Sequence, residues 1–154
     1  MVDIVNKVIR SRMMAGIAGK NTKPEIVIRK ALHCIGFRFK LHCADLPGKP
    51  DIVFPKYAAI ILINGCFWHR HNCHMFRWPS THKSFWRKKL LANRARDERN
   101  RASYKELGWK VLIIWECALK GKTRRPLSEV VNTAANWLKF GSRSTEIIGR
   151  IPKP

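Results

Sequence analysis

The sequence predicts a mixed α/β fold in which helices flank a central sheet. Two continuous apolar runs, at residues 58–63 and 111–114, have the length and composition of fully buried strands. Helix-forming segments precede the first run and follow both, which favours an α/β arrangement around one sheet. The chain has 154 residues with 45% hydrophobic content, enough to bury the core of one compact domain.

The first half of the chain predicts one helix and three strands after a basic segment at residues 1–20. Thr22 to Glu25 has the pattern of a capping box with a proline in the first turn, so we expect a helix from about residue 23 to residue 34 that Gly36 ends. Residues 37–41 alternate apolar and basic side chains, the pattern of a half-buried strand. After a turn at 46–50, strands are expected at 51–54 and 58–63.

The second half predicts two helices around one buried strand. Residues 80–108 form a long and heavily charged helical stretch, and residues 109–115 form the strand. Residues 126–140 carry apolar side chains at helical spacing on one side. We therefore divide the chain into a basic N-terminal segment (1–20), a folded domain (21–140) and a loose basic tail with two prolines (141–154).

Charge and cysteine content narrow the class of protein. The net charge is +21, from 31 basic and 10 acidic side chains, and such an excess favours a nucleic acid as the partner. The longest apolar run, 57–63, is far too short to cross a bilayer, and no basic amphipathic helix or signal peptide is evident. Five cysteines, an odd count, favour a metal site in a cytoplasmic protein over a disulfide framework.

The densest group of chemically distinctive residues lies at 65–73. Cys66, His71 and Cys73 have the spacing to give three ligands to one tetrahedral zinc ion, in a structural role. Phe67 and Trp68 lie inside that loop, so a metal would stiffen a segment that carries two large rings. A stiff aromatic loop can separate stacked bases. Plain buried cysteines are the alternative.

The fourth zinc ligand must come from elsewhere in the chain. Cys117 is favoured over Cys34 and Cys43, because Cys117 closes a central strand that should neighbour the strand leading into the loop. His69 is a candidate general base, since the usual pKa of histidine suits proton abstraction at neutral pH. Spacing alone does not decide whether His69 or His71 binds the metal.

Among the ten carboxylates, Asp51 is the best candidate for a catalytic Mg²⁺ ligand. It stands at the junction of a turn and a strand and precedes three apolar residues, which would hold its oxygens rigidly for a hard cation. An ordinary turn residue after Pro50 is the alternative. Glu25 can serve the capping box or a metal equally well. Glu116 follows a buried strand, where an ordinary strand-end charge is favoured over a supporting role for a ligand.

With these residues in view, the chain resembles the very short patch repair (Vsr-type) mismatch endonucleases. The resemblance runs from about Arg10 to Lys122 and rests on five segments in the same order: residues 10–14, 19–25, 46–51, 65–69 and 111–117. It implies a restriction-endonuclease-like core with an added zinc site. It also implies nicking of double-stranded DNA on the 5′ side of the thymine in a T·G mismatch, the lesion that deaminated 5-methylcytosine leaves. We expect a monomer that works in the nucleoid, with mismatch-repair proteins as further partners and no membrane.

The resemblance also assigns roles to individual residues. Asp51 and the main-chain carbonyl of Ile63 would bind Mg²⁺, His69 would activate water, and Glu25 would assist. Four residues would hold zinc: Cys66, His71, Cys73 and Cys117. The DNA contacts implied are Met14, Phe67, Trp68, Trp86, Lys89 and Asn93. Apart from the resemblance, phosphate contacts are expected from the basic side chains of Arg77, Lys83, Arg87, Lys88, Lys89, Arg94 and Arg96. Of the neighbours Phe85 and Trp86, we expect one to be exposed, and the resemblance favours Trp86.

One position departs from the family pattern. The family commonly has a histidine two residues before Cys66, paired with the acid that corresponds to Asp97, whereas this chain has Asn64. Asparagine can donate a hydrogen bond to a phosphate, but it can neither carry a positive charge nor transfer a proton. We expect altered catalysis at this position with the fold retained.

Two other functions are compatible with the sequence. The first is a zinc-stabilised module that binds mismatched or distorted DNA with weak or no cleavage, which Asn64 favours. The second is a restriction-type nuclease that cuts paired DNA with the same core. Cleavage of duplexes with and without a T·G pair in the presence of Mg²⁺ separates the three.

Overall fold

In the computed structural model, residues 21–151 are described, and they fold around one five-stranded sheet. The strands are β1 (Lys40–Leu41), β2 (Ile52–Phe54), β3 (Ala59–Asn64), β4 (Lys110–Trp115) and β5 (Thr145–Ile147), and they lie side by side in chain order. The pairs β1–β2 and β2–β3 are antiparallel, whereas the pairs β3–β4 and β4–β5 are parallel. The predicted mixed sheet is confirmed.

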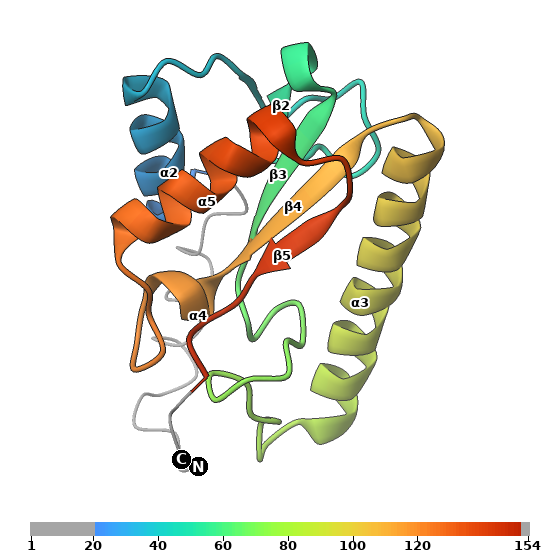
Figure 1. The fold of residues 1–154 in the computed structure, drawn as a ribbon. Coiled ribbons are helices and arrows are strands. Elements are labelled where there is room, and N and C mark those ends of the chain that lie inside the picture. The colour runs from blue at the N-terminus through green and yellow to red at the C-terminus, as the bar shows by residue number, and fades with distance from the viewer. Residues whose placement is uncertain (1–20, 152–154) are drawn as a thin grey trace.

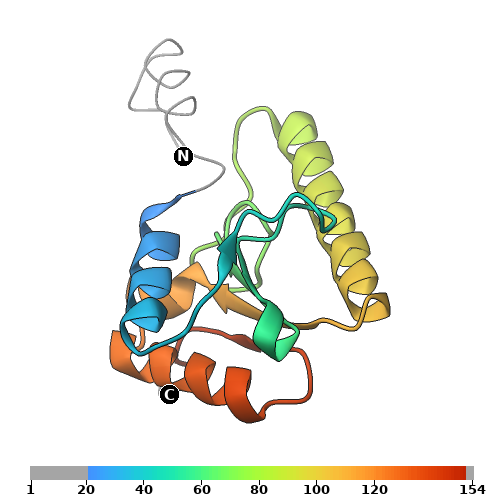
Figure 2. The ribbon, with the colours of Figure 1, turned by 90° about the horizontal axis from the view of Figure 1, so that it is seen from above.

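Helices cover both faces of the sheet. Figure 2 shows α3 (Lys83–Glu106) on one side, and α2 (Lys23–Cys34) and α5 (Leu127–Phe140) on the other. A single 3₁₀ turn, η1 (Pro55–Tyr57), joins β2 to β3, and the short helix α4 (Glu116–Leu119) follows β4. Parallel strands need a long crossover connection, and α3 supplies it between β3 and β4 (Figure 1).

Each face of the sheet has its own apolar core. On the α2 and α5 side, Ile61 and Leu112 are fully buried against Leu32, Val130 and other helix residues. On the α3 side, a smaller cluster surrounds Tyr104, whose hydroxyl donates to the main-chain oxygen of Pro47. Because both faces are covered, β3 and β4 are apolar except at Asn64 and Lys110, one at the end of β3 and the other at the start of β4.

Three sequence-based expectations about the elements need correction. The predicted strand over 37–41 pairs only at Lys40 and Leu41, although Phe37 is buried in the core as its alternation indicated. The capping box does not form: Thr22 precedes α2 without a side-chain cap, because the Glu25 carboxylate is engaged elsewhere. The long charged helix is confirmed but begins at Lys83 rather than at residue 80.

The expectation of a loose tail over 141–154 is wrong for the part that the structure describes. Residues Thr145–Ile147 form β5, which adds to the parallel edge of the sheet beside β4. The Glu146 carboxylate accepts a hydrogen bond of 2.8 Å from the indole nitrogen of Trp115, and the main-chain N of Arg150 donates to Thr123. The folded domain therefore extends past residue 140.

One expectation concerns residues outside the described range. The basic segment 1–20, with Met14, lies there, so its expected contact with DNA stays a prediction. Within residues 21–151, no helix combines the length and the apolar character needed to cross a bilayer.

Candidate active site and metal centre

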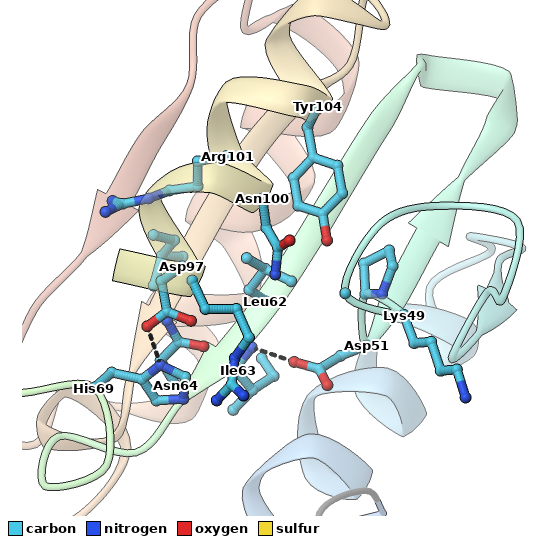
Figure 3. A pocket seen from close by; sticks show the side chains of 14 residues that line it. Lys49, Asp51, Leu62, Ile63, Asn64, His69, Asp97, Asn100, Arg101 and Tyr104 are labelled. Atoms are coloured by element: carbon cyan, nitrogen blue, oxygen red, sulfur yellow. Dashed lines mark hydrogen bonds and ion pairs between the residues drawn. The ribbon is translucent and has the colours of Figure 1, made fainter. Parts of the chain in front are cut away.

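Asp51 stands just before β2 and turns its carboxylate toward β3. Its Oδ2 accepts a hydrogen bond of 2.9 Å from the main-chain N of Ile63 (Figure 3). Since the N–H and C=O of one strand residue face the same neighbouring strand, the Ile63 carbonyl also lies on the β2 side. Burial, with a smaller contribution from Glu25, raises the pKa of Asp51 to about 6, although the hydrogen bond from Ile63 acts in the opposite direction. A nearby cation would favour the ionised form of this carboxylate.

His69, in the loop after β3, forms a pair with Asp97 of α3. The distance from His69 Nδ1 to Asp97 Oδ2 is 2.5 Å. A carboxylate on Nδ1 fixes the tautomer and leaves Nε2 free to accept a proton. The resemblance implied that Asp97 pairs with residue 64, but in this chain Asp97 pairs with His69.

The Asp51 carboxylate and the His69–Asp97 pair open onto one cavity of about 530 Å³. In Figure 3, Asp51 approaches from the β2 side and His69 from the loop after β3, with Ile63 between them. The cavity is lined further by cationic and amide side chains that suit a phosphate: Lys49, Asn64, Arg96, Asn100 and Arg101. Asn64 is 8% exposed, so its amide belongs to the cavity wall and not to the outer surface.

Glu25 lies beside Asp51 and has found partners other than the helix N-terminus. Its Oε1 is 2.6 Å from His42 Nε2 and 3.2 Å from Arg29 Nη1. Glu25 is 2% exposed, and a buried carboxylate needs such charged or donor partners. The ligand atoms of Glu25, His42 and Asp51 lie within 4.8 Å of one another.

A second cluster gathers around the loop that follows β3. The side chains of Cys66, His71, Cys73 and Cys117 place one ligand atom each within 4.8 Å of the others. His71 Nδ1 lies 3.5 Å from Cys66 Sγ and 3.6 Å from Cys117 Sγ. Three sulfurs and one imidazole nitrogen are a donor set that suits a tetrahedral metal ion. The cluster can bind a metal, and Cys117 joins it rather than Cys34 or Cys43.

The surroundings of this cluster favour metal-bound thiolates. Cys66 Sγ accepts a hydrogen bond from the main-chain N of Cys117, and Cys117 Sγ accepts one from Gly149. Without a cation, burial raises the pKa of both thiols, whereas a coordinating ion deprotonates them. The His71 ring stacks on Trp115 at 4.0 Å between centroids, which fixes its orientation. Glu116, for which the sequence favoured an ordinary strand-end charge, accepts a hydrogen bond from the main-chain N of Cys66 and thus supports the same loop.

Aromatic rings project from the same loop and meet the first turn of α3. Phe67 lies 5.2 Å from Trp68 and 5.4 Å from Trp86, measured between ring centroids, and Trp68 lies 5.8 Å from Trp86. Asn93 donates to the Trp68 carbonyl over 3.2 Å, which ties the loop to α3. Of the pair Phe85 and Trp86, Phe85 is the exposed one, at 57%, so the preference for Trp86 is wrong. Trp86 is half-buried among the other rings.

Most of the chain aligns with proteins named as DNA endonucleases or nicking enzymes. A family described as DNA mismatch endonuclease Vsr matches residues 2–75. The DNA mismatch endonuclease Vsr of Escherichia coli is 37% identical over 147 residues, which cover 96% of this chain and 94% of that protein. The chain belongs to the Vsr DNA mismatch endonuclease family. Its sheet and helices are thus a restriction-endonuclease-like core.

Two further relatives are type II nicking enzymes. V.XorIIP of Xanthomonas oryzae pv. oryzae is 44% identical over 119 residues, covering 77% of this chain and 88% of that protein. V.NmeAIP of Neisseria meningitidis is 41% identical over 122 residues, covering 79% of this chain and 87% of that protein. As a Vsr-family protein, the chain is a DNA endonuclease and therefore a phosphodiester hydrolase.

In this Vsr-family protein the structure unites most of the residues that the sequence singled out. Asp51, Ile63, Asn64 and His69 line one cavity, and the four predicted metal ligands form one cluster. Two residues were missed in their actual positions. The resemblance paired Asp97 with position 64, and its pairing with His69 was missed because nothing in the sequence links these two residues, which are 28 positions apart. His42 was not noticed at all, because it follows a short strand without any motif.

Proposed function

We propose that this chain nicks one strand of DNA on the 5′ side of the thymine in a T·G mismatch, with Mg²⁺ at Asp51 and structural Zn²⁺ in the cysteine–histidine cluster. The observation that supports this most is the shared cavity of Asp51 and the His69–Asp97 pair, next to a loop that carries large aromatic rings. A candidate ligand for a cation (Asp51), a candidate general base (His69) and the aromatic rings proposed to open the duplex thus lie near the same end of the sheet.

The residues fit both metals. Asp51 and the Ile63 carbonyl offer oxygen ligands, which Mg²⁺ prefers, and the buried Asp51 carboxylate needs a positive partner. When bound there, Mg²⁺ would polarise the phosphate and stabilise the negative charge that develops on it. The thiols and imidazole of the second cluster suit Zn²⁺, which would make the loop at 65–73 rigid.

The chain's own side chains then carry the proton transfer and the positioning of the phosphate. His69 Nε2 takes the proton of the attacking water, and Asp97 stabilises the imidazolium through Nδ1. Asn64 donates a hydrogen bond to the phosphate from the cavity wall. Glu25, next to Asp51, assists in holding the cation.

Recognition in this proposal depends on the aromatic loop. Phe67, Trp68 and Trp86 enter the stack next to the mismatch from the major groove, and Met14 enters from the minor groove. Opening a base step costs a few kcal/mol, and each base–aromatic stack returns about 1–3 kcal/mol. The balance is close, so a mispair that is already displaced opens and a Watson–Crick pair stays closed.

Other residues would complete the complex. Lys89 and Asn93 on α3 face the mismatch, and the basic side chains of the same helix bind phosphates in a salt-dependent but sequence-independent way. In the free protein Asn93 Oδ1 accepts from Arg96 and its Nδ2 donates to Trp68, so contact with a base requires these bonds to exchange. We place the protein in the bacterial cytoplasm, as a monomer on the nucleoid.

The experiment is nick mapping on two end-labelled duplexes that differ in one base pair, T·G in one and T·A in the other, incubated with MgCl₂. We expect one nick, on the 5′ side of the thymine, only in the mismatched duplex. Binding of the mismatch without a nick would favour a DNA-binding module, for which Asn64 is the supporting observation. Cuts in both strands of the paired duplex would favour a restriction-type nuclease. Either result would overturn the proposal.

The His69–Asp97 pair leads to a separate prediction. Asp97→Asn should lower the single-turnover nicking rate by about 10²–10³-fold, because an amide does not stabilise the imidazolium as a carboxylate does. The affinity for mismatched DNA should change little. Glu98→Gln is the matched control, since Glu98 lies one position along α3 in an exposed pair with Arg94. Equal rates for the two variants would remove the proton-transfer role of the pair.

A substitution at Asn64, in contrast, is expected to raise the nicking rate. Asn64→His should raise the nicking rate by about 3- to 100-fold, since an imidazole can carry charge or donate a proton at the phosphate. Asn132→His on the exposed face of α5 is the control for an added histidine. The rates are compared in a single-turnover assay with the T·G duplex. An Asn64→His variant no faster than the parent protein would refute this role.

A further inference from the structure

His42 lies in a position that the proposed Mg²⁺ site does not account for. Its imidazole Nε2 is 2.6 Å from Glu25 Oε1, and its main-chain N donates to the Asp51 main-chain oxygen over 3.1 Å. Three segments far apart in the sequence thus meet: helix α2, the residue after β1 and the start of β2. His42 is held to both acids, to one by its side chain and to the other by its backbone.

The arrangement is more than an ion pair at a surface. Glu25 is 2% exposed and Asp51 is mostly buried, so two carboxylates lie close together where water screens them poorly. Of these two carboxylates, Arg29 forms an ion pair with that of Glu25, at 3.2 Å. The backbone of His42 has φ +45°, a conformation that few non-glycine residues adopt and that directs its ring toward the two acids. A divalent cation among the three side chains would neutralise both acids.

We infer that His42 is a direct metal ligand and that Glu25, His42 and Asp51 together hold the cation through two carboxylates and one imidazole nitrogen. The inference rests on the proposed function, because it concerns the cation at Asp51. Ligand atoms at about 2.1 Å from an octahedral ion are about 3 Å apart when adjacent. The three atoms here lie within 4.8 Å of one another, and His42 Nε2 and Glu25 Oε1, at 2.6 Å, need to separate only slightly.

The chemistry of this ligand set changes the preference among metal ions. Mg²⁺ strongly prefers oxygen ligands, whereas imidazole nitrogen suits the first-row transition ions. A site of carboxylates and main-chain carbonyls alone would show little preference for such ions. With His42 as a ligand, the site should bind Mn²⁺ much more tightly than Mg²⁺, and replacing His42 should reduce the affinity for Mn²⁺ more than the affinity for Mg²⁺.

The test uses Mn²⁺ as the probe on the full chain that has first been loaded with zinc. Free Mn²⁺ is measured by electron paramagnetic resonance, and nitrogen ligands are detected by the ¹⁴N modulation of the electron spin echo from the bound ion. We compare the parent protein with His42→Gln. The control is His33→Gln, which removes an exposed imidazole near the end of α2 that contacts only Phe39 among the described rings.

The parent protein and His33→Gln should both show ¹⁴N modulation. In His42→Gln the modulation should fall by at least half, and Mn²⁺ should bind about tenfold more weakly or worse, with less than about a threefold change for Mg²⁺. Unchanged modulation in His42→Gln, or bound Mn²⁺ without any ¹⁴N modulation in the parent protein, would overturn the inference.

Nicking of the T·G duplex with MgCl₂, measured on the same samples, separates this inference from the proposed function. Nicking by a protein whose Mn²⁺ signal does not depend on His42 overturns the inference alone. A His42-dependent Mn²⁺ site in a protein that does not nick the mismatch overturns the proposed function alone. Asp51→Asn should abolish binding of Mn²⁺ at this site, and retention of the signal in that variant would contradict the shared site.

Discussion

Asp51→Asn is expected to abolish nicking while making the metal-free protein more stable. A cation at the reacting phosphate contributes several kcal/mol to the lowering of the barrier. Since about 1.4 kcal/mol corresponds to a factor of ten in rate, we expect the nicking rate to fall by about 10³-fold or more. The asparagine can still accept the hydrogen bond from the Ile63 main chain, so the fold around it should persist.

The gain in stability follows from the raised pKa of Asp51. Burial raises that pKa from 3.8 to about 6, so the folded chain binds the proton more tightly than the unfolded chain does. The carboxylate therefore costs no stability below about pH 4, an increasing amount between about pH 4 and pH 6, and the full amount above that. At pH 8, Asp51→Asn should raise the free energy of unfolding by about 1–3 kcal/mol. Below pH 4 it should have little effect.

Urea unfolding of both proteins without added divalent cation, at pH 4 and at pH 8, measures this difference. The zinc content is measured in each sample, so that only samples with equal zinc content are compared. Asp45→Asn, at an exposed turn position, is the matched control and should change neither stability nor nicking. Adding MgCl₂ should stabilise the parent protein and reduce its difference from Asp51→Asn. An Asp51→Asn protein that nicks normally, or that is less stable than the parent at pH 8, would contradict the account.

Cys117→Ala is expected to release the metal from the cysteine–histidine cluster and to weaken mismatch binding by more than about tenfold. The loop at 65–73 makes its own turn, with the main-chain N of His71 bonded to the oxygen of Cys66. The cluster ties this loop to the end of β4 together with the stack of His71 on Trp115 and the bond from Cys66 N to Glu116. Structural zinc sites contribute folding energy directly. We expect the melting temperature to fall by at least about 10 °C, an effect of several kcal/mol for a domain of this size.

The loss of mismatch binding is the more specific consequence. Phe67 and Trp68 are held between two cluster ligands, Cys66 and His71, and a mobile loop would lose the rigid rings that open the stack. Binding to the T·G duplex should weaken by more than about tenfold, because each lost base–aromatic stack costs about 1–3 kcal/mol. Zinc content, limited proteolysis and the affinity for both duplexes are measured together. Cys34→Ala, at an exposed site outside the cluster, is the control. Full zinc content in Cys117→Ala would contradict the ligand assignment.

The parts of the fold that were predictable are those with a local signal. The sequence runs that form most of β3 and β4 are apolar throughout. Helix α2 has residues that start and end helices at its two ends, and α5 has one apolar side. The cysteine–histidine cluster was predictable because three of its members lie within eight consecutive residues, and because two parallel neighbours, β3 and β4, bring Cys117 to the same end of the sheet. Position along the chain was enough in these cases.

The features that were missed depend on contacts between distant segments. β5 has only three residues, and its stability comes from pairing with β4 and from the bond between Glu146 and Trp115. Glu25 does not cap the start of α2, because its buried carboxylate bonds to His42 and Arg29, which are better partners than a helix end. No sequence pattern indicates that His42 contacts Glu25 or that Asp97 contacts His69. Such contacts between distant segments become visible only in the folded structure.

The most direct measurement of the central claim is the fluorescence of 2-aminopurine placed in the base step next to a T·G pair, recorded with zinc-loaded Asp51→Asn, which should bind without cutting. If the metal-braced aromatic loop opens the duplex, fluorescence should rise several-fold on the T·G duplex, stay low on the T·A duplex, and stay low on both when Cys117 is also replaced by alanine. Unchanged fluorescence on the T·G duplex, from a bound protein whose parent nicks that duplex, would show that cleavage does not require the loop to open the stack.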